Sequence, residues 1–191
     1  MSFIPVFKPL ITKTEIYAAK KSLEVGWLGM GKYVNLFEKE ISKIIQNPKK
    51  NVVAVNTGFS ALHLSCILIG LKKGDEVIAP SFTNIADLQS ILLTGAKPVL
   101  CDILEKNYCI NPDKIKKLIT KKTKAIIPID YGCSLADHDE INTIAKKNSL
   151  RIIHDAAHSL GSFYKKKAIG SFSDVAMFSF DPVKSFTCID G

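Results

Sequence analysis

Short apolar segments alternate with segments of helical periodicity along this chain of 191 residues, and this alternation restricts the fold more than any other feature. Short runs rich in valine, isoleucine and alanine are typical of buried strands, and the longer segments between them are typical of helices. We expect strands over 51–56, 76–80, 96–103, 124–130, 151–155 and 175–180. We expect helices over 59–71, 81–95 and 113–120, and one more within 130–148. This order predicts a three-layer α/β/α domain with a mainly parallel sheet.

Residues 1–26 are expected to form an extended arm and one helix, outside the α/β domain that occupies 27–191. Two prolines exclude a regular helix from the start of the arm. Thr14 can cap a helix that ends near Val25. A second helix, with an apolar stripe of period near 3.6, is expected over 35–45.

Composition places the chain among globular proteins, because 47% of its residues are hydrophobic. No uninterrupted apolar run reaches the roughly 18 residues that a membrane helix needs. The N-terminus lacks a basic region followed by an apolar run, so no signal peptide is expected. The five cysteines are an odd number, and none has the spacing of a zinc site. These features predict a cytoplasmic protein with reduced thiols, no metal and no membrane contact.

The formal net charge of +8 raises the question of a nucleic-acid partner. The lysines occur in short dispersed runs, most of them where helix ends or turns are expected, and Arg151 is the only arginine. Proteins that read bases or phosphates favour arginine. We therefore expect no nucleic-acid partner, and a mild attraction for anionic, phosphate-bearing substrates instead.

Polar residues gather where the expected strands end, which is where α/β proteins bind ligands. The turn at Thr57, the loop at Ser81, Asp155 and the segment 179–184 all lie at such ends. A carboxylate at a strand end and a lysine just past a later strand are two groups that an enzyme needs to hold pyridoxal phosphate. Most lysines are solvated surface groups, so spacing alone leaves the role of Lys184 open.

Three segments give a more specific signal: 72–103, DAAHSLG at 155–161, and GSFSDVAMFSFDPVKSFTCIDG at 170–191. They resemble the DegT-type (DegT/StrS) family of sugar aminotransferases, and the resemblance extends from about Trp27 to the last residue. It implies a fold-type I, aspartate aminotransferase-like large domain with pyridoxal 5'-phosphate as cofactor. The glycine-rich loop 26–33 corresponds to a loop near the active site and the dimer interface, although the residues alone fit a helix-to-helix linker equally well.

The resemblance also implies roles for individual residues. Lys184 corresponds to the Schiff-base lysine and Asp155 to the partner of the pyridinium nitrogen. His158 corresponds to a contact near the phenolic oxygen of the cofactor, and Ser179 to a phosphate ligand. A hairpin-like segment at 164–174 separates the two motifs that carry these residues.

The turn into the helix at 59–71 resembles the phosphate-binding turn of the family, which would place Gly58, Phe59 and Ser60 at the cofactor phosphate. Free amides at a helix N-terminus suit an anion. Phe59 departs from the family pattern, which has threonine or serine there, so Ser60 is expected to supply the hydroxyl. Asn84 is a second departure, because relatives often carry there an aromatic residue that stacks on the pyridine ring.

The implied reaction is transamination of a nucleotide-linked keto-deoxysugar, with glutamate as the expected amino donor, in amino-sugar and surface-polysaccharide biosynthesis by a homodimer. Some relatives replace the lysine with histidine and act as dehydratases, and Lys184 argues against that branch. Family members are about twice as long, so this chain is expected to be an N-terminal part that lacks the C-terminal small domain and is inactive alone.

Two other readings stay open. A non-catalytic or regulatory relative, or an inactive fragment, is compatible with Phe59, Asn84 and the length of the chain. Another fold-type I enzyme, such as a cysteine desulfurase or a glycine-cleavage-type lyase, is also possible, and a desulfurase would need a mobile-loop cysteine beyond this segment.

The remaining histidines are expected to be structural. His138 is expected at the surface, at the start of a helix, and His63 within the core. His154 precedes Asp155, and strand alternation turns it to the opposite face.

Overall fold

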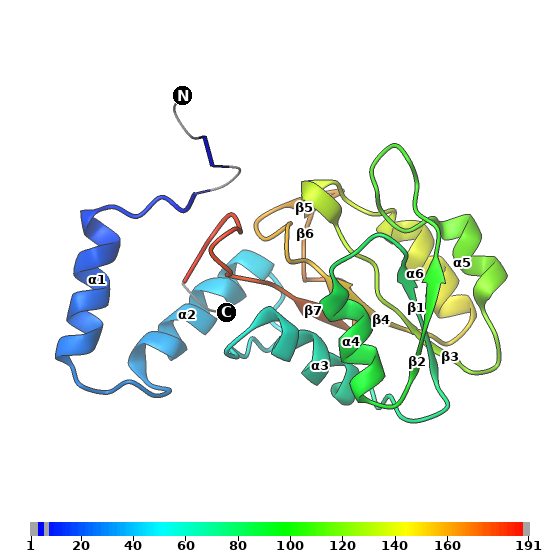
Figure 1. Cartoon of the computed structure of the whole chain (residues 1–191), viewed down its shortest axis with the longest axis horizontal. Coiled ribbons are helices and arrows are strands. Elements are labelled where there is room, and N and C mark those ends of the chain that lie inside the picture. The colour runs from blue at the N-terminus through cyan, green and yellow to red at the C-terminus, as the bar shows by residue number, and fades with distance from the viewer. Residues whose placement is uncertain (1–3, 6–7, 189–191) are drawn as a thin grey trace.

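The computed structural model describes residues 4–5 and 8–188, and Figure 1 shows a central sheet with helices on both sides. Within the described ranges, the main sheet has five strands in the order β2-β1-β3-β4-β7, and all of its paired neighbours are parallel. Its strands are β1 (Glu76–Pro80), β2 (Lys97–Cys101), β3 (Thr123–Ile126), β4 (Arg151–Asp155) and β7 (Val175–Met177). The predicted α/β class with a mainly parallel sheet is confirmed.

Helices occupy most of the positions that the sequence predicts, with boundaries that differ by a few residues. They are α1 (Lys13–Glu24), α2 (Lys32–Ile45), α3 (Gly58–Leu68), α4 (Ile85–Leu93), α5 (Pro112–Leu118) and α6 (His138–Lys147), with a short 3₁₀ turn η1 (Tyr131–Cys133). No helix in the described part of the chain combines the length and apolar character needed to cross a membrane.

Strand alternation builds two separate cores and so produces three layers. Ile78 of β1 packs in one core with residues of α5 and α6, such as Ile115 and Ile141. Its neighbours Val77 and Ala79 pack in the other core, with residues of α3 and α4. Successive side chains of a strand point to opposite faces, so one apolar strand supplies both cores.

The expected strand at 51–56 is wrong. This segment joins no sheet within the described ranges, and residues 51–55 line an apolar cavity of about 390 Å³ between α2 and residues 176–180. The backbone N–H of Ala54 donates to Glu38 Oε1 of α2 at 2.8 Å. The Glu38 side chain thus accepts a backbone hydrogen bond that a neighbouring strand would accept in a sheet. The apolar character of the segment alone could not predict this partner.

The N-terminal helix begins earlier than expected. Thr12, and not Thr14, is the N-cap of α1, and it forms a capping box with Glu15. None of the α1 residues is buried, and Figure 1 shows the helix apart from the sheet. In the loop that follows, Trp27 Nε1 donates to the backbone carbonyl of Met30 at 2.7 Å.

The hairpin expected within 164–174 is present just before β7. β5 (Phe163–Tyr164) and β6 (Lys167–Ala168) pair antiparallel. Lys165 and Lys166 join them with positive φ angles of 46° and 68°, the conformation of a tight two-residue hairpin turn.

Candidate active site

One cavity of about 540 Å³ lies at the carboxyl ends of β4 and β7, beside the N-termini of α3 and α4. Seven residues that the sequence predicts for the site line it: Gly58, Phe59, Asn84, Asp155, His158, Ser179 and Lys184. Ser60, the eighth, does not line it. Parallel strands bring their carboxyl ends to one edge of the sheet, which explains how residues so far apart in the sequence meet here.

The N-terminus of α3 forms one wall of the cavity. Thr57 is its N-cap, and its hydroxyl accepts the backbone N–H of Ser60 at 3.0 Å. A Cβ at Gly58 would lie 3.3 Å from Cβ and 3.4 Å from Oγ of Ser179, closer than side chains normally approach. Glycine at 58 therefore lets the helix start and Ser179 stand side by side.

Ser60 is committed to the cap. Its hydroxyl donates to Asn56 Oδ1 at 2.8 Å, and its N–H is already bonded to Thr57. The neighbouring Phe59 stacks on His63 one turn along α3, with ring centroids 6.5 Å apart. His63 is half-buried, so its prediction as a core residue is wrong.

Asp155 closes the floor of the cavity at the end of β4, with 2% of its surface exposed. Burial raises the pKa of its carboxyl, while the backbone N–H of Ala157, which donates to Oδ1 at 2.9 Å, and the charge of Lys184 act in the opposite direction. The structure thus provides a carboxylate with a fixed orientation at the base of the site.

Lys184 and His158 both line the cavity and contact each other, with Nζ and Nε2 3.0 Å apart. The backbone N–H of Gly132 donates to Nδ1 of His158 at 3.0 Å, so the neutral ring carries its proton on Nε2. Burial, followed by the charge of Lys184, lowers the pKa of His158 and favours this neutral form. The imidazole and the side-chain nitrogen of Lys184 are thus within hydrogen-bonding distance of each other.

Asn84 serves as the N-cap of α4. Its Oδ1 accepts the backbone N–H of Ala86 at 2.9 Å, and its side chain lies at the rim of the cavity. The amide therefore has a local structural task at a position where an aromatic side chain could not perform it.

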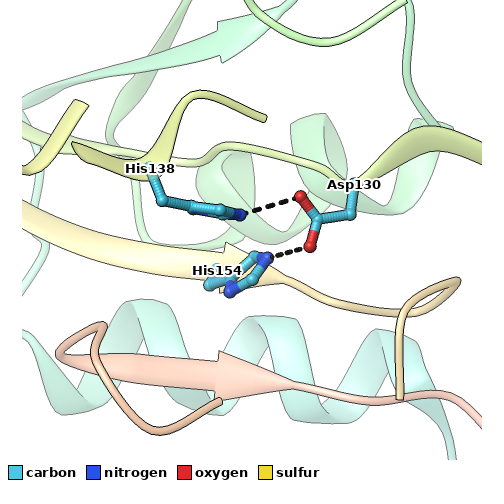
Figure 2. A group of neighbouring side chains, drawn as sticks. All are labelled: Asp130, His138 and His154. Atoms are coloured by element: carbon cyan, nitrogen blue, oxygen red, sulfur yellow. Dashed lines mark hydrogen bonds and ion pairs between the residues drawn. The ribbon is translucent and has the colours of Figure 1, made fainter. Parts of the chain in front are cut away.

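Behind the site, the buried carboxylate of Asp130 binds two imidazole rings, as Figure 2 shows. Its Oδ1 lies 2.9 Å from Nε2 of His138, and its Oδ2 lies 2.7 Å from Nε2 of His154. The backbone N–H of Ala136 and the hydroxyl of Ser159 donate to the same two oxygens. Burial alone would raise the pKa of Asp130, but the hydrogen bonds from the two rings lower it below its usual range.

This cluster corrects one prediction and supports another. His138 is buried, with 2% of its surface exposed, so its expected surface position is wrong. His154 points away from the cavity toward Asp130, as strand alternation predicts. The three side chains offer ligand atoms within 4.8 Å of one another. However, four donors already occupy the two carboxylate oxygens. The group is therefore a hydrogen-bonded cluster around one buried carboxylate, and it ties together the segments that carry the four donors.

Two buried carboxyl groups near the site escaped the sequence analysis, namely Asp87 and Asp130, both with 0% of their surface exposed. Asp130 ends an apolar segment and Asp87 interrupts an apolar helix. An acid within an otherwise apolar segment was the available signal.

Comparisons with known proteins agree with this geometry. The model of the DegT/DnrJ/EryC1/StrS aminotransferase family matches residues 9–191. Among solved structures, Spr1654 of Streptococcus pneumoniae, assigned as a sugar aminotransferase and solved in forms with pyridoxal or pyridoxamine phosphate, is 33% identical with a TM-score of 0.92. The match covers 96% of this chain and 50% of that one.

Two further structures give the same picture. DesV of S. venezuelae is 35% identical with a TM-score of 0.88, over 93% of this chain and 48% of that one. PseC of Helicobacter pylori, an aminotransferase of pseudoaminic acid biosynthesis, is 26% identical with a TM-score of 0.89, over 96% and 49%. The chain thus spans about half the length of these relatives.

Proposed function

This chain belongs to the DegT/DnrJ/EryC1/StrS aminotransferase family, and from this premise we propose that its cavity binds pyridoxal 5'-phosphate through Lys184. The observation that carries the proposal is the meeting of Lys184, His158 and the buried Asp155 around one cavity. A lysine amine, a ring donor and a carboxylate are the groups that this cofactor requires.

The cavity fits the cofactor at both of its ends. Asp155 supplies a buried carboxylate for the pyridine nitrogen, and His158 supplies a donor for the ring oxygen. At the other end, the start of α3 at Gly58 and the hydroxyl of Ser179 form a cradle that a Cβ at residue 58 would fill. Amides at a helix N-terminus suit a phosphate. When bound, the cofactor supplies an electron sink for amino-group chemistry.

Three side chains of the cavity, those of Lys184, His158 and Asp155, have roles in the proposed proton transfer. The contact of 3.0 Å with Nε2 of His158 holds Nζ of Lys184 in place at the cavity, where the amine would attack a carbonyl or take a proton. The Asp155 carboxylate would keep the cofactor's ring nitrogen protonated by offering it a negative charge. We propose that Nζ of Lys184 takes and returns the proton during the transfer of the amino group.

We propose a nucleotide-linked keto-deoxysugar as acceptor and glutamate as donor, within amino-sugar and surface-polysaccharide biosynthesis in the cytoplasm. The sugar aminotransferases among the structural relatives support the sugar class, and the net charge of +8 suits an anionic nucleotide. The proposal concerns a protein of the relatives' length that contains this chain, because the match spans about half of each of them.

We also propose that such a protein forms a homodimer. The loop before α2 exposes large apolar side chains close together in sequence: Trp27, Leu28 and Met30, each more than two-thirds exposed. Apolar groups at this density mark interaction surfaces more often than solvated ones. Sedimentation of the longer protein, with a Trp27→Ser and Leu28→Ser variant as comparison, tests this.

The cofactor proposal is tested by adding pyridoxal phosphate to the purified chain, reducing with borohydride and mapping the modified peptide. The expected result is a visible absorption band and a reduced adduct on Lys184. Lys184→Arg should abolish both, whereas Lys167→Arg, at an exposed lysine of β6, should change neither.

A label scattered over surface lysines, or no band, would reject the proposal for this chain. In that case the rival reading, a non-catalytic relative, would gain support from Phe59 and Asn84. Both residues line the cavity, and both depart from the pattern that the family resemblance implies.

A further inference from the structure

Asp87 is a buried acid for which the proposed chemistry has no use. It lies in the first turn of α4 with 0% of its surface exposed. Its Oδ2 accepts a hydrogen bond from the hydroxyl of Thr83, while its Oδ1 has no donor. An ionised carboxylate with one unsatisfied oxygen is among the most unfavourable groups in a protein interior.

Two titratable side chains face Asp87 from the elements packed against α4. One is Asp155 at the end of β4, whose carboxyl lies within hydrogen-bonding reach of the Asp87 carboxyl. The other is Cys66 of α3, a buried thiol whose pKa is raised to about 11, chiefly by burial. The surroundings therefore oppose a charge on this group.

Two buried carboxyl groups within hydrogen-bonding reach of each other cannot both be ionised at modest cost, so one of them holds a proton. The structure favours Asp155 as the charged member, because Ala157 N–H donates to it and Lys184 lies nearby. Burial, followed by the negative charge of Asp155, raises the pKa of Asp87 well above its ordinary value. A protonated Asp87 could also donate a hydrogen bond from Oδ1, the oxygen that otherwise has no partner.

We propose that Asp87 is a positioning residue that stays protonated and donates a hydrogen bond to the carboxylate of Asp155. The pair then carries one negative charge, located on the carboxylate that lines the cavity. Asp87 fixes the orientation of that carboxylate from behind, as Ala157 N–H does from the other side. No covalent step is involved, and the proton stays within the pair.

The consequence for the cofactor rests on the proposed function. A pyridinium nitrogen at Asp155 would meet a single, oriented negative charge in place of two repelling ones. Loss of the Asp87 donor should loosen Asp155 and weaken cofactor binding, whereas an amide at residue 87 should preserve the hydrogen bond.

The proton itself is tested in the chain without cofactor. Infrared difference spectra should show the carbonyl stretching band of a buried protonated carboxyl, which Asp87→Asn removes. The folded state binds one proton more than the unfolded state above the ordinary aspartate pKa, so stability falls as pH rises. Relative to Asp87→Asn, the wild-type Tm should therefore drop by about 3 °C or more between about pH 5 and about pH 8.

Asp75→Asn is the matched control, because Asp75 is also buried but caps the Lys72 N–H outside the cavity. It should keep the infrared band and follow the wild-type pH curve. A band unchanged in Asp87→Asn, or a constant Tm difference between Asp87→Asn and wild type across this range, would overturn the proposal.

Cofactor binding gives an independent test. Titration with pyridoxal phosphate should give Asp87→Asn a Kd within about threefold of wild type. Asp87→Leu, which lacks any donor, should bind about tenfold more weakly, as for a lost hydrogen bond to a charged group. Equal affinity of Asp87→Leu and wild type would contradict the positioning role. If wild type itself binds no cofactor, the proposed function fails, while the infrared and Tm measurements still decide whether Asp87 holds the proton.

Discussion

The side-chain amine of Lys184 lies 3.0 Å from Nε2 of His158, and the backbone N–H of Gly132 occupies the other ring nitrogen. The neutral ring therefore carries its one N–H on Nε2, the nitrogen that lies beside Lys184. This arrangement links the loop at η1 to the lysine through a single imidazole. It predicts that changes at His158 affect both the pH response of the fold and the behaviour of Lys184.

Replacement of His158 by Gln should remove an acid-sensitive contribution to stability. Burial and Lys184 lower the pKa of His158 in the folded chain, so below the ordinary value near 6.5 the unfolded chain binds more protons. Wild-type stability should therefore fall as pH drops through and below this value, and His158→Gln should lack this decline. Thermal unfolding by circular dichroism across this range measures it.

His158→Phe separates the titration from the hydrogen bond. It should also lack the acid-dependent decline, but it cannot form a hydrogen bond with Lys184. Parallel pH curves for wild type and both variants would contradict the assigned pKa direction.

Gly58→Ala should impair the cradle between α3 and Ser179. The added Cβ would meet Ser179 at 3.3 Å, so the serine must move by a few tenths of an ångström. Stability should change by less than about 1 kcal/mol, since alanine favours the helix while the crowding opposes it. Affinity for pyridoxal phosphate should fall about tenfold, as expected when preorganised anion contacts are displaced.

Gly29→Ala is the control for this change. A Cβ at Gly29 meets only an ordinary contact, 3.7 Å from Nε1 of Trp27. It should leave cofactor affinity within about twofold of wild type, within the range of a neutral surface substitution. Equal affinities for Gly58→Ala and Gly29→Ala would show that the cradle does not hold the phosphate.

The sequence predicts the layers of the fold well and the polar network behind the site poorly. Alternation and length identify β1 and β4 to the residue, because each has a buried apolar centre and is buried at every position after its first residue. The segment 51–56 has the same apolar character, yet its partner is a side chain of α2. Burial of a polar side chain depends on long-range partners, so His138 at a helix start reads as exposed until Asp130 is seen beside it.

Asp130→Asn should destabilise the chain strongly. Each carboxylate oxygen accepts two hydrogen bonds, so an amide nitrogen in either place would face two donors. We expect a loss of about 3 kcal/mol in the free energy of unfolding, measured by urea denaturation. Because the pKa of Asp130 is lowered in the folded state, its contribution should be complete above about pH 4 and lost in stronger acid.

Asp137→Asn provides the comparison. Asp137 is exposed and caps α6, where its Oδ1 accepts the backbone N–H of Glu140 at 3.1 Å. Asparagine caps a helix about as well, so the change should be within about 0.5 kcal/mol. Similar losses of unfolding free energy in the two variants would contradict the stabilising role assigned to the buried Asp130 carboxylate.

Asn84→Phe should lower the stability of the chain and raise its affinity for the cofactor. Loss of the cap on α4 should lower stability by about 1 kcal/mol. The added aromatic ring at the cavity should raise affinity for pyridoxal phosphate about three- to tenfold, through stacking on the pyridine ring. Asn84→Asp keeps the cap and adds no ring, so it should lose neither stability nor affinity by comparison. An unchanged Kd in Asn84→Phe would place residue 84 away from the ring face.

The position of β7 at the end of the sheet also bears on how this polypeptide behaves during synthesis. β7 pairs with β4 on one side, and its residues Ala176 and Met177 border the apolar cavity beside 51–55. An unprotected strand edge next to apolar surface is a template for another strand. A nascent chain that has emerged only as far as Lys184 would present this edge, and N-terminal regions fold first. Chaperone dependence and concentration-dependent aggregation should therefore originate at Val175–Met177.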